Sequence, residues 1–133
     1  MALLHAEVWF KEPFSCGQTI SWLCLVGSAL LVLHGLYMLK KFGKPKDRLE
    51  DTTALVQQGI YHFIRHPMYA SLLLLGLGVF FKGPSLVDAA LLVGLLAFVT
   101  MAGRMEEQEN LERFGTSYAD YMEVTKMFVP WIY

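Results

Sequence analysis

The sequence predicts an all-α integral membrane protein with three transmembrane helices, at about residues 19–39, 67–81 and 85–103. Hydrophobic residues make up 55% of the 133 residues and charged residues only 17%, which is little polar cover for a small soluble protein. The apolar residues are also gathered into long runs rather than spread along the chain. Such runs match the hydrocarbon core of a bilayer, so we expect one membrane-embedded domain over residues 1–133.

The first apolar run, residues 19–39, is long enough to cross a bilayer. As a helix it reaches roughly 31 Å, about one hydrocarbon core. Its small residues Gly27 and Gly35 allow close contact between helices. Residues 1–18 lack the basic start of a signal peptide. We therefore expect them to be retained and to lie along the membrane surface.

The second and third runs are predicted to form a helical hairpin. Residues 67–81 begin with a proline, which the first turn of a helix tolerates, but they reach only roughly 22 Å, short for an independent span. A tight turn at residues 82–84 follows, and Ser85 with Asp88 resembles a capping box for the run 85–103. We interpret Asp88 as a helix-start residue rather than a buried functional carboxylate.

The basic residues predict the orientation of the chain. The loop 40–66 holds six Lys and Arg residues and the tail after residue 103 holds three, whereas residues 1–18 and the hairpin turn hold one each. The positive-inside rule therefore places the loop and the C-terminus in the cytoplasm and the N-terminus outside. Within the loop, Asp51-Thr52-Thr53 is expected to cap a short helix that runs through Gln57 and ends at Gly59.

The tail, residues 104–133, is predicted to be cytoplasmic and amphipathic rather than spanning. Gly115 is expected to end one helix and Ser117 to cap another. The last six residues, FVPWIY, are typical of an aromatic anchor at a membrane interface.

Charge and cysteine content exclude several functions. The net charge of -1 gives no reason to expect nucleic acid as a partner. Cys16 and Cys24 do not have the spacing of a metal or redox site, so we interpret them as unpaired thiols and expect no metal. The lipid bilayer is the expected partner. A homodimer is a further hypothesis, through helix faces that carry Gly27, Gly35, Gly76 and Gly94.

A cation, an imidazole and a phenol stand together where the second run begins, in Arg65-His66-Pro67-Met68-Tyr69. The hairpin returns the chain to the same membrane face, so Glu106 can approach His66 although 40 residues separate them. Each group alone has an ordinary explanation, such as an arginine that reaches lipid headgroups or a solvated glutamate. Their occurrence together, in this order, instead predicts an active site at the cytoplasmic membrane face.

The chain around these residues resembles a known group of enzymes, the isoprenylcysteine carboxyl methyltransferase family and the related phospholipid N-methyltransferases. The resemblance covers about residues 50–133 and implies a membrane enzyme that uses S-adenosylmethionine without a Rossmann fold. The chain departs from the pattern at Thr53-Ala54, where a histidine–glutamate pair is common. The matching motifs are Gly59-Ile60-Tyr61, Arg65 to Tyr69, Glu106-Glu107, Phe114-Gly115 with Tyr118 and Tyr121, and Val129-Pro130.

The resemblance also implies roles for individual residues. Arg65, His66 and Glu106 would be catalytic. Arg104 is the candidate for an arginine that contacts the substrate. The S-adenosylmethionine would be bound by Leu55, Val56, Tyr61, His66, Pro67, Tyr69, Glu106 and Glu107.

Methyl transfer from a sulfonium is an in-line displacement, so the enzyme mainly aligns the reactants and excludes water. Aromatic faces attract a sulfonium, which suits Tyr61 and Tyr69. An amine acceptor needs a base, for which His62, His66 and a glutamate are open alternatives, whereas a carboxylate or thiolate needs none. The acceptor is expected to be lipophilic or amphiphilic: a phospholipid amine, a lipid-like carboxylate or a small thiol.

Two other functions remain as alternatives. Membrane reductases of the steroid-reductase type, which use NADPH, have a similar core near their C-terminus. Binding of NADPH without binding of S-adenosylmethionine would favour that function. The second alternative is a non-catalytic three-helix scaffold. It predicts that Tyr69→Phe, His66→Ala and Glu106→Gln leave function unchanged.

Overall fold

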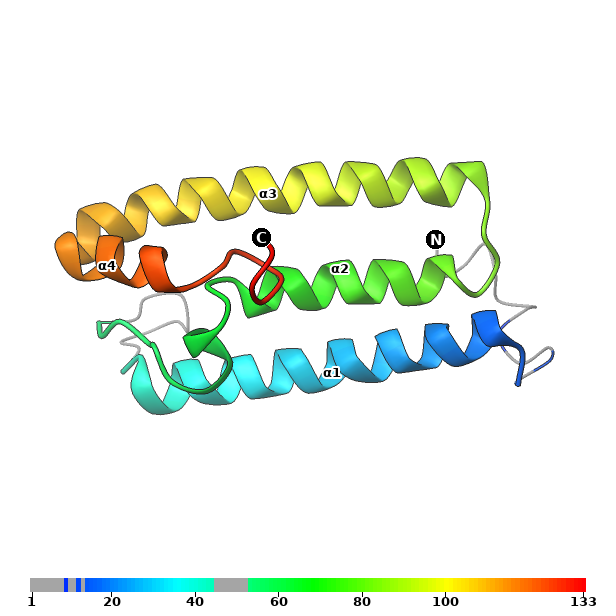
Figure 1. Cartoon of the computed structure of the whole chain (residues 1–133), viewed down its shortest axis with the longest axis horizontal. Helices are drawn as coiled ribbons and strands as arrows, with labels where there is room; N and C mark the ends of the chain where they lie inside the picture. The colour runs from blue at the N-terminus through cyan, green and yellow to red at the C-terminus, as the bar shows by residue number, and fades with distance from the viewer. Residues whose placement is uncertain (1–8, 10–11, 13, 45–52) are drawn as a thin grey trace.

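The computed structural model describes residues 9, 12, 14–44 and 53–133. Three long helices lie side by side in an all-α arrangement, and a short helix folds back at one end (Figure 1). The described residues form no β-sheet, although one isolated parallel bridge joins Ile64 to Lys126. The helices in chain order are α1 (Cys16–Phe42), the 3-10 helix η2 (Gly59–His62), α2 (Pro67–Phe80), α3 (Leu86–Phe114) and α4 (Thr116–Val124).

Two of the described helices, α1 and α3, are long and apolar enough to cross a membrane. The prediction of spans at 19–39 and 85–103 agrees with them. The third predicted span, 67–81, corresponds to α2, which is apolar but shorter. Its crossing of the membrane therefore stays a prediction.

Helices α1 and α2 pack closely through small and hydroxyl residues. The Ser21 hydroxyl donates to the Gly78 carbonyl at 2.6 Å, and the Ser28 hydroxyl donates to the Ser71 carbonyl at 2.7 Å. A Cβ added to Gly35 would lie 3.5 Å from the Pro67 Cγ. These small residues thus serve contact within the chain, as glycine and serine do in membrane helix pairs.

Of the four glycines considered for a homodimer, Gly27, Gly35 and Gly76 face other helices of the same chain. A Cβ at Gly27 would meet Leu74, and one at Gly76 would meet Leu95 and Leu92 of α3. A Cβ at Gly94 meets nothing within 4 Å. Among the described residues, Gly94 therefore lies on an open face, and the homodimer stays a prediction.

The hairpin of α2 and α3 is confirmed. Ser85 is the N-cap of α3, where its hydroxyl accepts from the Asp88 amide at 3.1 Å and donates to the Asp88 carboxylate at 2.7 Å. Asp88 is a helix-start residue as predicted, and it is also fully buried. The capping box therefore holds α3 where it leaves the turn.

The predicted division between the third span and the tail is wrong as a structural boundary. Helix α3 continues without a break from Leu86 to Phe114, because residues 104–114 are good helix formers with no proline or glycine. Gly115, with φ +61°, ends α3 as predicted. Helix α4 begins at Thr116, so Ser117 is not its cap.

The loop before α2 also differs from its prediction. Residues 53–58 are not helical, so the expected helix through Gln57 is absent from them. Gly59, with φ +61°, begins η2 rather than ending a helix. Asp51, Thr52 and most of residues 1–18 lie outside the described residues.

The C-terminal residues fold back against the start of α2. The Phe128 and Val129 amides donate to the Tyr133 carbonyl at 2.8 and 2.7 Å. Phe128 is buried in the core, whereas Trp131 and Ile132 are exposed, which suits the predicted interfacial anchor. The core at this end consists of Ile64, Ala70, Val99, Met127 and Phe128.

Candidate active site

The site begins with the backbone of Arg65 and His66, which the C-terminal segment holds in place. The Arg65 amide donates to the Lys126 carbonyl at 2.8 Å, and the His66 amide donates to the Met127 carbonyl at 3.1 Å. The Lys126 amide donates in return to the Phe63 carbonyl at 3.1 Å. Because these amides come just before α2, their bonds fix the direction in which the motif side chains leave the chain.

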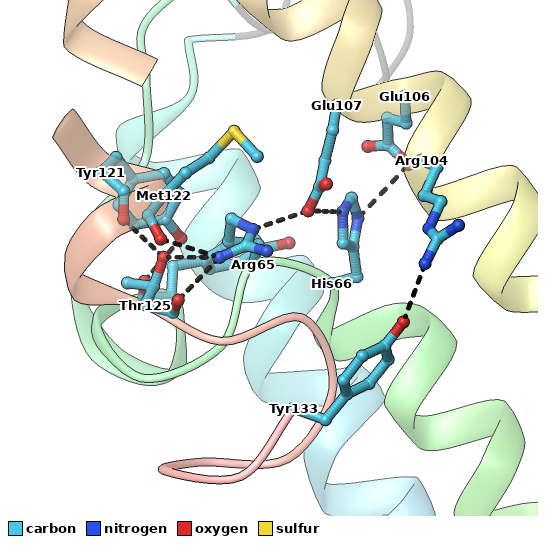
Figure 2. Close-up of polar contacts among 10 residues, drawn as sticks. Arg65, His66, Arg104, Glu106, Glu107, Tyr121, Met122, Thr125 and Tyr133 are labelled. Atoms are coloured by element: carbon cyan, nitrogen blue, oxygen red, sulfur yellow. Dashed lines mark hydrogen bonds and ion pairs between the residues drawn. The ribbon is translucent and has the colours of Figure 1, made fainter. Parts of the chain in front are cut away.

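The Arg65 side chain is largely buried, with 11% exposed, and ties α3 to the C-terminal segment (Figure 2). Its Nε donates to the Glu107 Oε1 at 2.6 Å. Its Nη1 donates to the Thr125 and Met122 carbonyls at 2.6 and 3.2 Å. The guanidinium is therefore paired with a carboxylate and with backbone acceptors, as a buried charge requires.

His66 lies between two carboxylates and is only 4% exposed. Its Nε2 is 3.2 Å from the Glu107 Oε1, and its Nδ1 is 3.6 Å from the Glu106 Oε2. Burial favours the neutral imidazole, but the hydrogen bonds and charges of the two glutamates outweigh burial and raise the pKa of His66 above its ordinary value. The two glutamates therefore stabilise the imidazolium form of the ring.

The two glutamates differ in their surroundings, although both lie beyond the apolar part of α3. The Glu107 side chain is 10% exposed and the Glu106 side chain is 47% exposed. Burial raises the pKa of the Glu106 carboxyl, but hydrogen bonds from His66 and Tyr69 outweigh burial and lower that pKa below its ordinary value. Glu106 is thus an ionised carboxylate with one side open.

The predicted aromatic liners come close to this cluster. The Tyr69 ring lies 5.6 Å from the His66 ring between centroids. Tyr61 is buried, and its carbonyl accepts from the Tyr121 hydroxyl at 2.6 Å. Burial, with a smaller contribution from the Glu106 charge, raises the pKa of Tyr61 far above its ordinary range. Tyr61 therefore stays a neutral phenol.

The remaining predicted residues border the cluster. Pro67 is buried in the first turn of α2, and Val56 is buried and Leu55 half-buried in the preceding loop. Arg104 is exposed, and its Nη2 donates to the Tyr133 hydroxyl at 3.4 Å. Figure 2 shows Glu107 on one side of the His66 ring and Glu106 with Arg104 on the other. The structure thus brings the predicted residues to one end of the bundle, while their roles stay predictions.

The sequence did not reveal several residues that shape the site. Thr125 and Met122 act through backbone carbonyls, which leave no mark in a sequence. Gly103 lets α3 approach the motif, since a Cβ there would lie 2.8 Å from the Met127 Cε and 3.5 Å from the His66 Cδ2. A glycine just before the acidic patch was the available signal, because such a glycine often marks a close approach.

This fold and this site define a class, a membrane protein with a polar cluster of charged and aromatic groups at one end of an apolar helical bundle. The family described as phospholipid methyltransferase matches residues 17–117, and the chain belongs to that family. The predicted resemblance is thereby confirmed.

One curated relative adds to this comparison. The chain is 24% identical over 137 aligned positions to a protein from a Pseudomonas species that is named methanethiol S-methyltransferase. The alignment covers 96% of this chain and 51% of the relative. The chain therefore spans about half the length of the curated relative it matches. No solved structure matches the chain.

Proposed function

We propose that the protein transfers a methyl group from S-adenosylmethionine to a lipophilic or amphiphilic acceptor at the cytoplasmic face of a membrane. The observation that supports this most directly is the cluster of Arg65, His66, Glu106 and Glu107 at one end of the bundle, in a chain of the phospholipid methyltransferase family. Placing the largely buried charges of Arg65 and Glu107 beside a buried imidazole is costly for a scaffold alone.

The residues of the site suit the proposed cofactor. S-adenosylmethionine supplies an activated methyl group on a sulfonium, together with ribose hydroxyls, an ammonium and a carboxylate. The aromatic rings of Tyr61 and Tyr69 can face the sulfonium. The glutamates can accept hydrogen bonds from hydroxyls or the ammonium. Leu55, Val56 and Pro67 provide an apolar border that helps to exclude water.

A small thiol is the first acceptor to test and a phospholipid amine is the second. The thiol follows from the relative, which is named for S-methylation of methanethiol. The amine follows from the family description. Both are found in a bilayer, so both can reach a site at the end of apolar helices.

The cofactor is tested by titration calorimetry of the purified protein in detergent or nanodiscs with S-adenosylhomocysteine. We expect binding that His66→Ala weakens by about tenfold or more, equivalent to about 1.4 kcal/mol. Glu109→Gln, an exposed glutamate on the same helix, serves as the matched control and should bind like the wild type. No binding by folded wild-type protein would refute the proposal, and binding of NADPH instead would favour the reductase.

The acceptor is tested with methyl-labelled S-adenosylmethionine and two offered acceptors, a volatile alkyl thiol and vesicles that contain phosphatidylethanolamine. Labelled thioether or labelled phospholipid identifies the acceptor class. Binding of S-adenosylhomocysteine without transfer to either would leave the cofactor proposal intact and exclude both acceptors.

A further inference from the structure

We propose that Glu106 is the catalytic base that takes the proton from an acceptor thiol, and that His66 positions Glu106 rather than acting as the base itself. This inference rests on the proposed function and deepens it. It chooses among the bases that the sequence left open, namely His62, His66 and the glutamates. It also separates the two roles predicted for Glu106, catalytic residue and cofactor ligand.

Neither ring nitrogen of His66 is available to the methyl acceptor. Nε2 faces the Glu107 carboxylate at 3.2 Å, and Nδ1 faces the Glu106 carboxylate at 3.6 Å. The side chain is 3% exposed, so a substrate cannot reach either nitrogen without displacing a glutamate. A general base must lie within hydrogen-bonding distance of the proton it removes. His66 does not meet this condition.

Glu107 is also committed to other groups. Its Oε1 accepts from the Arg65 Nε at 2.6 Å and faces the His66 Nε2 at 3.2 Å. The side chain is 10% exposed and lies on the side of the imidazole ring opposite Glu106 (Figure 2). Protonation of Glu107 would leave the buried Arg65 charge without its carboxylate. The role of Glu107 is therefore to hold Arg65 and His66 in place.

His62 lies outside the cluster. It is exposed on η2, and its ring packs edge-on against Phe63 with centroids 5.1 Å apart. The described contacts do not join His62 to Arg65, His66 or either glutamate. Glu106 remains. Its side chain is 47% exposed, and its Oε2 faces the buried His66 ring.

The methyl transfer balances when Glu106 accepts the proton of the thiol. The thiol sulfur forms a bond to the methyl carbon, and the carbon–sulfur bond of the sulfonium breaks with its electron pair left on the departing sulfur. The acceptor S–H proton passes to the Glu106 carboxylate, and the S–H electron pair stays on the acceptor sulfur. The products are a methyl thioether, S-adenosylhomocysteine and a protonated carboxyl group.

A carboxylate can serve as this base although its proton affinity is low. A free thiol has a pKa of roughly 8.5 or above. The S–H becomes far more acidic as its sulfur acquires a bond to carbon, so a carboxylate in hydrogen-bonding reach removes the proton as that bond forms. The hydrogen bonds from His66 and Tyr69 keep Glu106 ionised and ready for the next proton.

The test uses the full-length protein in detergent, the variant Glu106→Gln and a series of thiols. The series runs from an alkyl thiol to aryl thiols that are already ionised at the assay pH. With the alkyl thiol we expect Glu106→Gln to lower kcat by about 100-fold. The ionised thiols have no proton to lose, so with them the kcat of Glu106→Gln should be within about threefold of the wild-type kcat. Glu109→Gln is the matched control and should follow the wild type throughout.

Two further measurements separate the base from other roles. Binding of S-adenosylhomocysteine by Glu106→Gln should stay within about threefold of the wild type, less than 1 kcal/mol. His66→Gln should lower kcat by the same factor for every thiol, because it disturbs the position of Glu106 and not the proton transfer itself.

The outcomes are distinct. A Glu106→Gln deficit that is equal for all thiols would overturn the inference. Binding of S-adenosylhomocysteine weakened tenfold or more in Glu106→Gln would assign Glu106 to the cofactor and overturn the inference while keeping the proposed function. Methylation of phospholipid without methylation of any thiol would also overturn it. Failure of the folded wild type to bind S-adenosylhomocysteine would refute the proposed function itself.

Discussion

Glu107 connects two cations through a single oxygen, since its Oε1 contacts both the Arg65 Nε and the His66 Nε2. We predict that Glu107→Gln lowers the free energy of unfolding by about 3 kcal/mol, because the Arg65 guanidinium then loses its carboxylate while it stays buried. Thermal unfolding in detergent, followed by circular dichroism, measures the change. Glu109→Gln should unfold like the wild type, and equal melting temperatures for the two variants would contradict the prediction.

The raised pKa of His66 predicts a pH dependence of stability. The imidazolium is bound more favourably in the folded state than in the unfolded state, where the pKa is near 6.5. Its contribution is therefore complete below about pH 6.5 and is lost as the pH rises through the folded-state pKa. We expect the melting temperature of the wild type to fall over this range by more than that of His66→Gln. Parallel profiles for the two proteins would refute the assignment.

The sequence placed the charged groups at one site but did not assign their contacts. Arg65, His66 and the glutamates could be grouped because the hairpin returns the chain to one membrane face. The sequence could not distinguish Glu106 from Glu107, since neighbours on a helix differ by a rotation that the packing of α3 decides. It also could not identify the Thr125 and Met122 carbonyls, because every residue has a carbonyl.

Helix α3 carries both the apolar span and the acidic residues as one continuous element. The composition changes from apolar to polar near residue 103, but the helix does not end there. For this reason hydropathy predicted the span and misplaced the structural boundary. Continuity matters for the site, because it sets Glu106 and Glu107 on the same rigid element as the packed residues Leu92 and Leu95.

Gly103 is predicted to set the distance between α3 and the motif. Gly103→Val would crowd the Met127 Cε and the His66 ring, and overpacking of this kind costs about 1–3 kcal/mol. We expect a lower melting temperature and binding of S-adenosylhomocysteine weakened by about tenfold. Gly94→Val makes the same change on the same helix, where a Cβ meets nothing within 4 Å. Equal effects of the two substitutions would show that the close approach at Gly103 is unimportant.

The two ends of the bundle have different electrostatic character. The end with α4 holds the ion-paired cluster and the exposed Lys40 and Lys41. At the opposite end Lys82 is 3% exposed, donates to the Gln18 Oε1 at 2.8 Å and lies 3.8 Å from the centroid of the Trp22 ring. Because Lys82 is enclosed, the described residues at that end offer little cationic surface, which agrees with the prediction that the cluster end is cytoplasmic.

Packing supports α2 as a third span despite its length. A Cβ at Gly17 would lie 3.4 Å from the Phe81 carbonyl, and a Cβ at Gly35 would lie 3.5 Å from the Pro67 Cγ. The contact with α1 thus runs along the whole of α2, a rise of roughly 22 Å. Because α1 is long and apolar enough to cross a membrane, this packing favours the prediction that α2 crosses beside it.

Labelling of cysteines tests this arrangement, because three spans and two spans place the same residues on different sides of the membrane. With three spans, Cys16 and a Leu86→Cys substitution lie on the outer side and Glu109→Cys lies in the cytoplasm. If α2 does not cross, Leu86→Cys lies in the cytoplasm and Glu109→Cys outside. All three positions are exposed, so each can react.

Each single cysteine is placed in a chain with the other native cysteines changed to serine. We expect an impermeant maleimide on intact cells to label Cys16 and Leu86→Cys, and to label Glu109→Cys only after permeabilisation.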